Sequence, residues 1–255
     1  MKQWTHGWLA GWAWRLSHLT QARGVWVVVV LILGIHGLVE AAGGVQHAAQ
    51  WYLTFGLRRT EVATGALWQL GSYALLHGSW LHVLGNALCV LVLGSRVEYL
   101  LGLPGLFKTL AAGVIGGAVG HLVLADGGAG AAPLVGISGA CVALLLALTT
   151  LSPDSRMWPI PVSGRSLGRG ILLGELIFAL INPQLHLAGF SRLGVVLVRH
   201  GFESWFAVGH ACHLAGGVAG WLVARAVLRP RVDLETLRQR RRHREASASG
   251  GKSYR

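Results

Sequence analysis

The feature that most limits how this chain can fold is its series of long segments without a charged residue. Only 13% of the residues are charged, against about 25% in soluble domains, and 53% are hydrophobic. Because a transmembrane helix needs about 20 apolar residues, the segments predict an all-α membrane protein with six spans. A water-soluble single domain and a disordered chain are both excluded. The segments are 24–39, 62–95, 109–125, 127–153, 170–191 with one acid, and 204–224. Only the second part of 62–95, with a helix over about 79–97, needs to span the membrane.

The distribution of positive charge predicts the orientation of these spans. Six spans place both termini on one side of the membrane. Eighteen of the 22 Lys and Arg residues lie in the two terminal segments and in the second and fourth loops, all on that side. The other side holds Arg58, Arg59, Arg192 and Arg199. Since Lys and Arg are enriched in cytoplasmic loops, both termini are predicted to be cytoplasmic.

The charge and composition also divide the chain into three regions. Residues 1–23 carry Trp4, Trp8 and Trp12 on one helical face, which is typical of a segment lying in the headgroup region. Residues 24–228 form the six-span membrane domain. Residues 229–255 are a basic tail that is predicted to be disordered. Because about half of the net charge of +12 is in this tail, anionic lipid is the expected partner and nucleic acid is not.

Polar residues inside the spans are costly, and they are therefore candidates for function. His82 and Asn86 are four residues apart in the second span, so they share a helical face. Ser138 opens the fourth span, and His213 lies near the start of the sixth. These three spans run in the same direction, which places the four side chains in one layer about 5–10 Å below the outer surface.

This set of side chains predicts acyl transfer. Ser138 would be the nucleophile, and His213 would be the general base that later protonates the leaving amine. His82, Asn86 and the backbone N–H of Ser138 could donate hydrogen bonds to the oxyanion. Small residues at helical spacing would let the fourth and sixth spans approach closely enough for Ser138 to contact His213. No acidic residue is evident in the sequence to orient His213, so a Ser–His dyad is expected rather than a triad.

At these residues the sequence resembles the rhomboid family of intramembrane serine proteases. The family motifs are H-x4-H-x3-N in the second span, G-x-S-G in the fourth and H-x-x-G-x-x-x-G in the sixth. Any one motif is weak, but all three occur here in order and on the expected spans, within residues 25–228. They read His77…His82…Asn86, Gly136-Ile-Ser138-Gly139, and His213…Gly216…Gly220, and Gly94-x3-Glu98-x3-Gly102 is a further match.

The resemblance implies a six-helix bundle whose water-filled cavity opens to the periplasm of a bacterial inner membrane. The implied substrates are single-span membrane proteins, cut next to a small residue, and no metal or other cofactor is expected. The fifth span and loop 189–206, with Phe202, Trp205 and Phe206, would form a lateral gate and lid. Ser138 and His213 would be catalytic, and His82, Asn86, Gly136 and Gly139 would bind the oxyanion, with His77, Gly216 and Gly220 in support.

Two positions depart from the family pattern. The residue four positions after the serine is usually aromatic and stacks on the catalytic histidine, but here it is Val142. The Trp-Arg pair usual in the first outer loop is not evident, although Trp51-Tyr52 and Arg58-Arg59 lie there. These departures concern the orientation of His213 and the seating of the loop.

Other interpretations of these residues remain open. His210 is a rival base, and His77, His82, His210 and His213 could bind zinc. Glu98 and Glu175 are interpreted as cap or loop anchors. Cys89, Cys141 and Cys212 lie within apolar segments, which favours core positions over disulfides. The competing functions are an inactive rhomboid-like protein that binds transmembrane helices, a small-solute transporter, and a specialised branch that processes C-terminal sorting tails.

Overall fold

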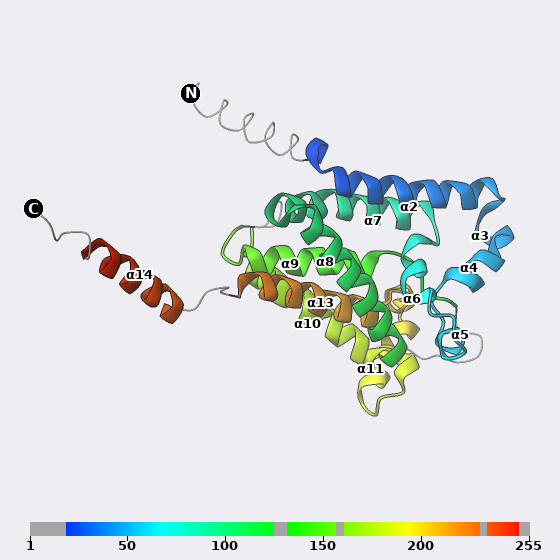
Figure 1. Cartoon of the computed structure of the whole chain (residues 1–255). Coiled ribbons are helices and arrows are strands. Elements are labelled where there is room, and N and C mark those ends of the chain that lie inside the picture. Colours follow the sequence, from blue (N-terminus) through cyan, green and yellow to red (C-terminus); the bar gives the residue numbers. More distant parts are fainter. Residues whose placement is uncertain (1–18, 125–131, 157–160, 230–233, 250–255) are drawn as a thin grey trace, which may run out of the picture.

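The chain folds into a bundle of helices. The computed structural model describes residues 19–124, 132–156, 161–229 and 234–249. Within these residues, β-structure is limited to two isolated bridges, so the predicted all-α class is confirmed. The bundle (Figure 1) consists of α2 (Arg23–Ala41), α7 (Trp80–Cys89), α8 (Ser95–Leu124), α9 (Ser138–Leu151), α10 (Gly164–Ile181) and α13 (His210–Leu228).

Shorter elements connect these helices. A π-helical segment, η2 (Val90–Gly94), joins α7 to α8. The first connection, between α2 and α7, contains α3 (Gly44–His47), α4 (Ala49–Phe55), α5 (Arg59–Ala63), α6 (Gln69–Ser72) and η1 (Tyr73–Leu75). The connection between α10 and α13 contains η3 (Pro183–Leu185), α11 (Phe190–Arg199) and α12 (Glu203–Phe206).

Three helical stretches of the described residues are long and apolar enough to cross a membrane: Arg23–Ala41, Trp80–Leu124 and His210–Leu228. The second of these is bent at Gly102, where φ is 69° and ψ is 177°. Such a positive φ favours glycine, and Pro104 then fits the first turn of a new helix. With Trp80–Leu124 divided at this bend, and with α9 and α10 added, the bundle is compatible with the six predicted spans.

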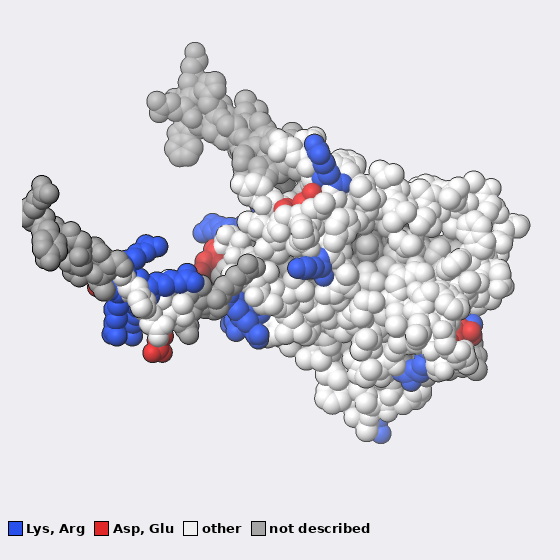
Figure 2. All heavy atoms as spheres, viewed as in Figure 1, with Lys and Arg blue, Asp and Glu red and all other residues white. Residues whose placement is uncertain are grey.

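The surface of the bundle is divided into charged and uncharged zones. Helix α2 begins and α13 ends at the same end of the bundle (Figure 1). Figure 2 shows most of the charged atoms near this end and on α14, with a broad uncharged surface beyond them. Large apolar side chains are exposed around the bundle, including Val30 (64%), Leu81 (83%) and Val123 (69%). Because water would disfavour so much exposed apolar surface, this is the surface of an integral membrane protein.

Small residues bring α8, α9 and α13 into close contact, which the sequence predicts for α9 and α13. A Cβ atom on Gly216 of α13 would collide with the carbonyl oxygen of Gly139 on α9, and one on Gly220 would collide with that of Ala143. On α8, a Cβ atom on Gly113 would stand 2.6 Å from the Cα of Ala140. The three helix backbones therefore pack directly against one another at the centre of the bundle.

Glu98 acts as a cap, as predicted, but it caps a helix other than its own. Its carboxylate oxygens accept hydrogen bonds from the backbone N–H groups of Gly24 (3.2 Å) and Val25 (3.1 Å), in the first turn of α2. The first N–H groups of a helix have no partner within the helix, and a negative charge near them is favourable. Glu98 thus joins the start of α8 to the start of α2.

Replacing Glu98 by Ala is expected to destabilise the fold, because both N–H groups of α2 lose their partner in a partly buried environment. The expected loss is about 1–3 kcal/mol of unfolding free energy. A thermal unfolding curve of the purified protein in detergent measures this loss. Glu245→Ala is the control, since its pair with Arg241 on α14 is exposed and should be worth under about 0.5 kcal/mol. Equal melting temperatures for the two variants would contradict the role of Glu98.

The first outer connection is held against the segment that leads into α9. Leu57 and Leu134 form an isolated β-bridge, with N···O distances of 2.9 and 3.0 Å. The buried side chain of Gln69 accepts from the N–H of Arg58 and donates to the carbonyls of Leu53 and Thr54. These contacts seat the loop in a chain that lacks the family's Trp-Arg pair.

Two predictions about the ends of the chain meet different outcomes. Residues 1–18, which include the three predicted anchor tryptophans, lie outside the described residues. The tail was predicted to be disordered, but the structure forms α14 (Leu234–Ser249) there. Its Arg, Glu, Gln, Leu and Ala residues are good helix formers, and Arg241 pairs with Glu245 one turn later at 2.7 Å.

Candidate active site

Ser138 is the first residue of α9, and a non-helical segment that contains Gly136 leads into it. Gly136 has φ of 108°, which favours glycine, and its N–H donates to the carbonyl of Tyr73 at 3.0 Å. The hydroxyl of Tyr73 donates to the carbonyl of Val114 on α8 at 2.8 Å. The start of α9 is therefore fixed from both sides. As the first residue of the helix, Ser138 has an N–H group without an intrahelical partner.

His213 on α13 contacts Ser138 directly. Its Nε2 atom lies 2.7 Å from the Oγ of Ser138, which is a hydrogen-bond distance. The two residues are 75 positions apart in the sequence, and the close contact of α9 with α13 at Gly139 and Gly216 brings them together. The structure thus joins the two residues that the sequence predicts as nucleophile and base.

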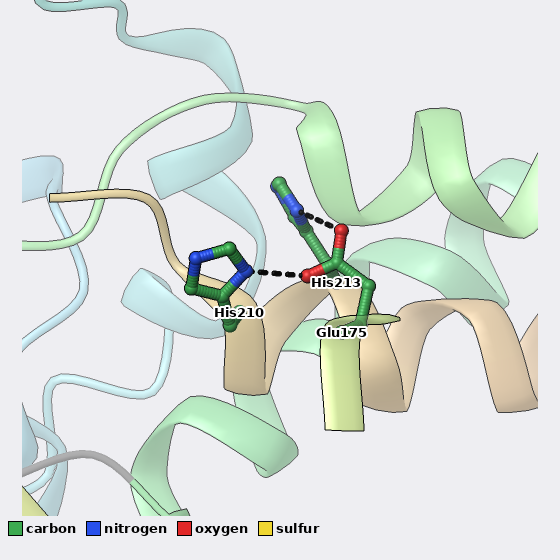
Figure 3. A group of neighbouring side chains, drawn as sticks. All are labelled: Glu175, His210 and His213. Atoms are coloured by element: carbon green, nitrogen blue, oxygen red, sulfur yellow. Dashed lines mark hydrogen bonds and ion pairs between the residues drawn. The ribbon is translucent and has the colours of Figure 1, made fainter. Parts of the chain in front are cut away.

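Glu175 on α10 completes a row of three side chains. Its Oε1 atom lies 3.1 Å from the Nδ1 of His213 (Figure 3). The other ring nitrogen, Nε2, is the one that contacts Ser138. The side chain of Glu175 is only 17% exposed, and that of His213 is 14% exposed. The expectation that no acidic residue orients His213, and that Glu175 is a cap or loop anchor, is therefore wrong.

The start of α10 explains why the sequence misplaced Glu175. The segment 170–191, whose one charged residue is Glu175, begins the fifth span at residue 170 and puts Glu175 near its cytoplasmic end. The helix instead begins at Gly164, where the Oγ of Ser163 accepts from the N–H of Ser166 at 3.2 Å. Arg165 and Arg169 lie within the helix, so Glu175 is about three turns from its start and reaches the level of His213. The N-cap serine was the signal that could have corrected the boundary.

His210 also contacts Glu175, and not Ser138. Its Nδ1 lies 2.7 Å from Oε2 of Glu175, and its Nε2 lies 2.8 Å from the carbonyl oxygen of Trp205 on α12. Figure 3 shows the carboxylate placed between the two imidazole rings, with one oxygen directed to each. His210 is therefore engaged elsewhere and is not placed as the rival base.

His82 and Asn86 on α7 lie beside Gly136, two residues before Ser138. A Cβ atom on Gly136 would stand 2.7 Å from Nε2 of His82 and 3.5 Å from Nδ2 of Asn86. The Nδ2 of Asn86 is buried, with no hydrogen-bond partner among the described residues. A free donor beside the first turn of α9 is suited to the oxygen of a tetrahedral intermediate. Gly136 leaves the space that such an oxygen needs.

Replacing Asn86 by Leu is expected to slow the chemical step, because the oxyanion loses one side-chain donor. Loss of one such donor typically costs about 100- to 1000-fold in kcat. The check is steady-state cleavage of a single-span reporter in liposomes, with KM measured separately. Nδ2 has no partner among the described residues, and Oδ1 accepts only a long contact of 3.8 Å from the Sγ of Cys141, so folding should be little affected. An unchanged kcat would remove Asn86 from the oxyanion site.

His77 supports this region from outside the spans. It is buried between η1 and α7, and burial lowers its pKa to about 4, so the imidazole is neutral at pH 7. Its ring meets that of His82 edge to face at 5.0 Å, and its carbonyl accepts from the hydroxyl of Tyr52 at 2.5 Å. His77 therefore packs behind His82. Nothing in the residue pattern indicates that Tyr52 holds it.

The region around His213 lacks the aromatic contact that the family usually supplies after the serine. Val142 instead packs beside Gly217, where its Cγ1 lies 3.0 Å from the position of a Cβ. Phe178 on α10 stacks on His210, with centroids 4.9 Å apart and ring planes at 18°. His210 in turn meets His213 edge to face at 6.3 Å. The aromatic support thus comes from α10 and reaches His213 through His210.

The four histidines considered as zinc ligands lie in two separate groups. His77 and His82 lie on the α7 side, whereas His210 and His213 lie with Glu175. The ligand atoms of the second group are within 4.8 Å of one another, so by distance they could hold a metal ion. An ion there would take the Nδ1 of His213 from Glu175. The three side chains already satisfy one another by hydrogen bonds.

The predicted positions of the cysteines are partly wrong. Cys141 and Cys212 are buried in the core, but Cys89 is exposed on α7. All three are free, as expected for thiols in apolar helices.

Comparison with known proteins now adds to this geometry. A family model described as the rhomboid domain matches residues 64–230, which is more than half of the chain. The chain belongs to the rhomboid family. None of the curated proteins compared with it matches the chain. Rhomboid proteins are in general intramembrane serine proteases that act on membrane-embedded substrates. The matched range contains Ser138, His213 and Glu175.

Proposed function

We propose that this rhomboid protein is a serine endopeptidase that cleaves transmembrane segments of single-span membrane proteins. The observation that carries the proposal is the 2.7 Å contact between Oγ of Ser138 and Nε2 of His213. A serine hydroxyl is a weak nucleophile until an adjacent base takes its proton. The contact supplies that base in a protein whose family cuts within membranes.

The residues of the site support a sequence of steps. Ser138 attacks the scissile carbonyl as its proton passes to Nε2 of His213. The oxygen of the tetrahedral intermediate accepts from the N–H of Ser138 and the side chains of Asn86 and His82. His213 then protonates the leaving amine, which releases the first product. A water molecule, activated by His213, hydrolyses the acyl group from Ser138.

The elements between α10 and α13 are suited to admit a helical substrate from the side. Helix α11 has a strongly one-sided distribution of apolar residues, and Phe190, Leu193 and Val196 are exposed on it. The rings of Phe202 and Trp205, close to the start of α13, pack against each other at a tilt of 58°, with centroids 4.7 Å apart. We propose that α11 and α12 form the lateral gate and lid. We also propose a bacterial inner membrane as location, with both termini cytoplasmic and the site toward the periplasm.

The test is cleavage of a single-span reporter by the purified protein in liposomes. The wild type is expected to release two fragments, and Ser138→Ala is expected to release none. The cut should map inside the membrane segment or at its edge. If wild type and Ser138→Ala both leave the reporter intact while retaining it on co-purification, the protein is instead an inactive rhomboid that binds transmembrane helices.

A further inference from the structure

We propose that Glu175 and His210 are positioning residues that hold His213 in its reactive tautomer, so that the site works as a Ser–His–Glu row with a second histidine behind the acid. The inference rests on the proposed protease function and deepens it. It assigns roles to two residues outside the dyad. It also predicts which nitrogen of His213 carries the proton.

The partners of His213 determine its tautomer. A carboxylate oxygen only accepts hydrogen bonds, so the 3.1 Å contact with Glu175 requires a proton on Nδ1 of His213. Nε2 is then the free acceptor, and it faces the hydroxyl of Ser138 at 2.7 Å. The opposite tautomer would leave Nδ1 and the carboxylate facing each other as two acceptors. Glu175 therefore selects the form of His213 that can remove a proton from Ser138.

The partners of His210 determine its charge. Its Nδ1 faces the carboxylate of Glu175 at 2.7 Å, and its Nε2 faces the carbonyl of Trp205 at 2.8 Å. Both partners are acceptors, so both nitrogens must carry a proton, and the ring is an imidazolium. Its positive charge balances the negative charge of Glu175 within the bundle. An unbalanced carboxylate at this depth would be costly.

Packing fixes His210 in this arrangement. Phe178, three residues after Glu175 on α10, stacks on the imidazole at 4.9 Å, which is favourable for a cation. Phe178 also meets the ring of Trp205 edge to face at 5.5 Å. His210 is thus held by α10 on one side and by the backbone of α12 on the other. The segment proposed as the lid therefore contacts the group that orients the base.

The row also accounts for where protons go during the reaction. When Nε2 takes the proton of Ser138, His213 becomes an imidazolium next to the Glu175 carboxylate, which stabilises the new charge. The Nδ1 proton stays on His213, and no proton moves to Glu175. His210 keeps its own two protons throughout. Glu175 and His210 touch neither substrate nor the reacting atoms, so their effect passes through His213.

The main experiment measures kcat and KM for reporter cleavage by Glu175→Gln, which keeps the shape of the side chain and removes its charge. We expect kcat to fall by about 100-fold or more, with KM within about threefold of wild type. The matched control is Glu98→Gln, which neutralises the partly buried carboxylate that caps α2. It should lower the melting temperature and leave kcat within about threefold. A kcat for Glu175→Gln near wild type would overturn the inference.

A double-variant comparison separates positioning from simple helix packing. His210→Asn is expected to lower kcat by about tenfold in the wild-type background. In the Glu175→Gln background it should change kcat by less than about twofold, because His210 acts through Glu175. Independent effects that multiply would contradict a shared positioning role. This result is separate from the proposed function, which fails if the wild type leaves the reporter intact or if Ser138→Ala cleaves as fast as wild type.

A spectroscopic measurement on the unaltered protein does not depend on how any variant folds. Histidine ¹⁵N chemical shifts in lipid at pH 7 report which ring nitrogens carry protons. We expect His213 to be protonated on Nδ1 alone and His210 on both nitrogens. A His213 protonated on Nε2, or a neutral His210, would overturn the inference.

Discussion

Removing both Ser138 and His213 is expected to slow cleavage no more than removing either one. The two side chains act on the same proton across 2.7 Å, so neither retains its function without the other. Each of Ser138→Ala, His213→Ala and the double variant should lower kcat by at least about 10⁴-fold. The rates are measured on the single-span reporter in liposomes at equal protein density.

The matched controls are Ser155→Ala and His200→Ala, which make the same changes at exposed positions of the chain. Both should cleave at the wild-type rate. The account of the site would be contradicted if the double variant were slower than the wild type by the product of the two separate effects. That result would show that Ser138 and His213 contribute independently.

The second large effect is expected for Gly216→Ala, a change of one methyl group in the packed centre of the bundle. The new Cβ would collide with the carbonyl oxygen of Gly139, which is backbone and cannot swing away. Helices α9 and α13 must then separate, and Oγ of Ser138 moves away from Nε2 of His213. A misplacement of about 1 Å at a reacting pair costs about 100-fold in rate, and overpacking costs about 1–3 kcal/mol of stability.

Gly170→Ala on α10 is the matched control for this prediction, because a Cβ there meets nothing within 4 Å. Alanine is the better helix former, so this variant should be as stable as wild type or slightly more stable. Melting temperature and reporter cleavage are measured for both variants. If Gly216→Ala matched Gly170→Ala in both measurements, the close contact of α9 with α13 would not be what aligns the site.

The contact of Ser138 with His213 could be predicted from the sequence because it follows from topology. Both residues lie near the starts of spans that run in the same direction, and the small residues around them allow close approach. The family resemblance rests on the same residues, and the match over residues 64–230 confirms it. That Glu98 caps a helix was also predictable, since a carboxylate near a helix start is a common cap.

Glu175 could not be placed from the sequence by counting charges alone. Arg165 and Arg169 lie inside α10, and a search for charge-free segments therefore starts this helix too late. That error places Glu175 at the membrane edge, although its carboxylate contacts His210 and His213. The seating of the outer loop by Gln69 and Tyr52 was missed for a different reason. Their hydrogen bonds go to backbone groups, which leave no signal in the residue pattern.

The measurement that tests the central claim most directly is labelling by a fluorophosphonate probe, which reacts with an activated serine. The wild-type protein in lipid is expected to be labelled at Ser138, and labelling should be lost in Ser138→Ala and in His213→Ala. The second variant keeps the serine and removes only its base, so its loss of labelling shows that His213 activates Ser138. Equal labelling of the wild type and His213→Ala, or none of the wild type, would contradict the account.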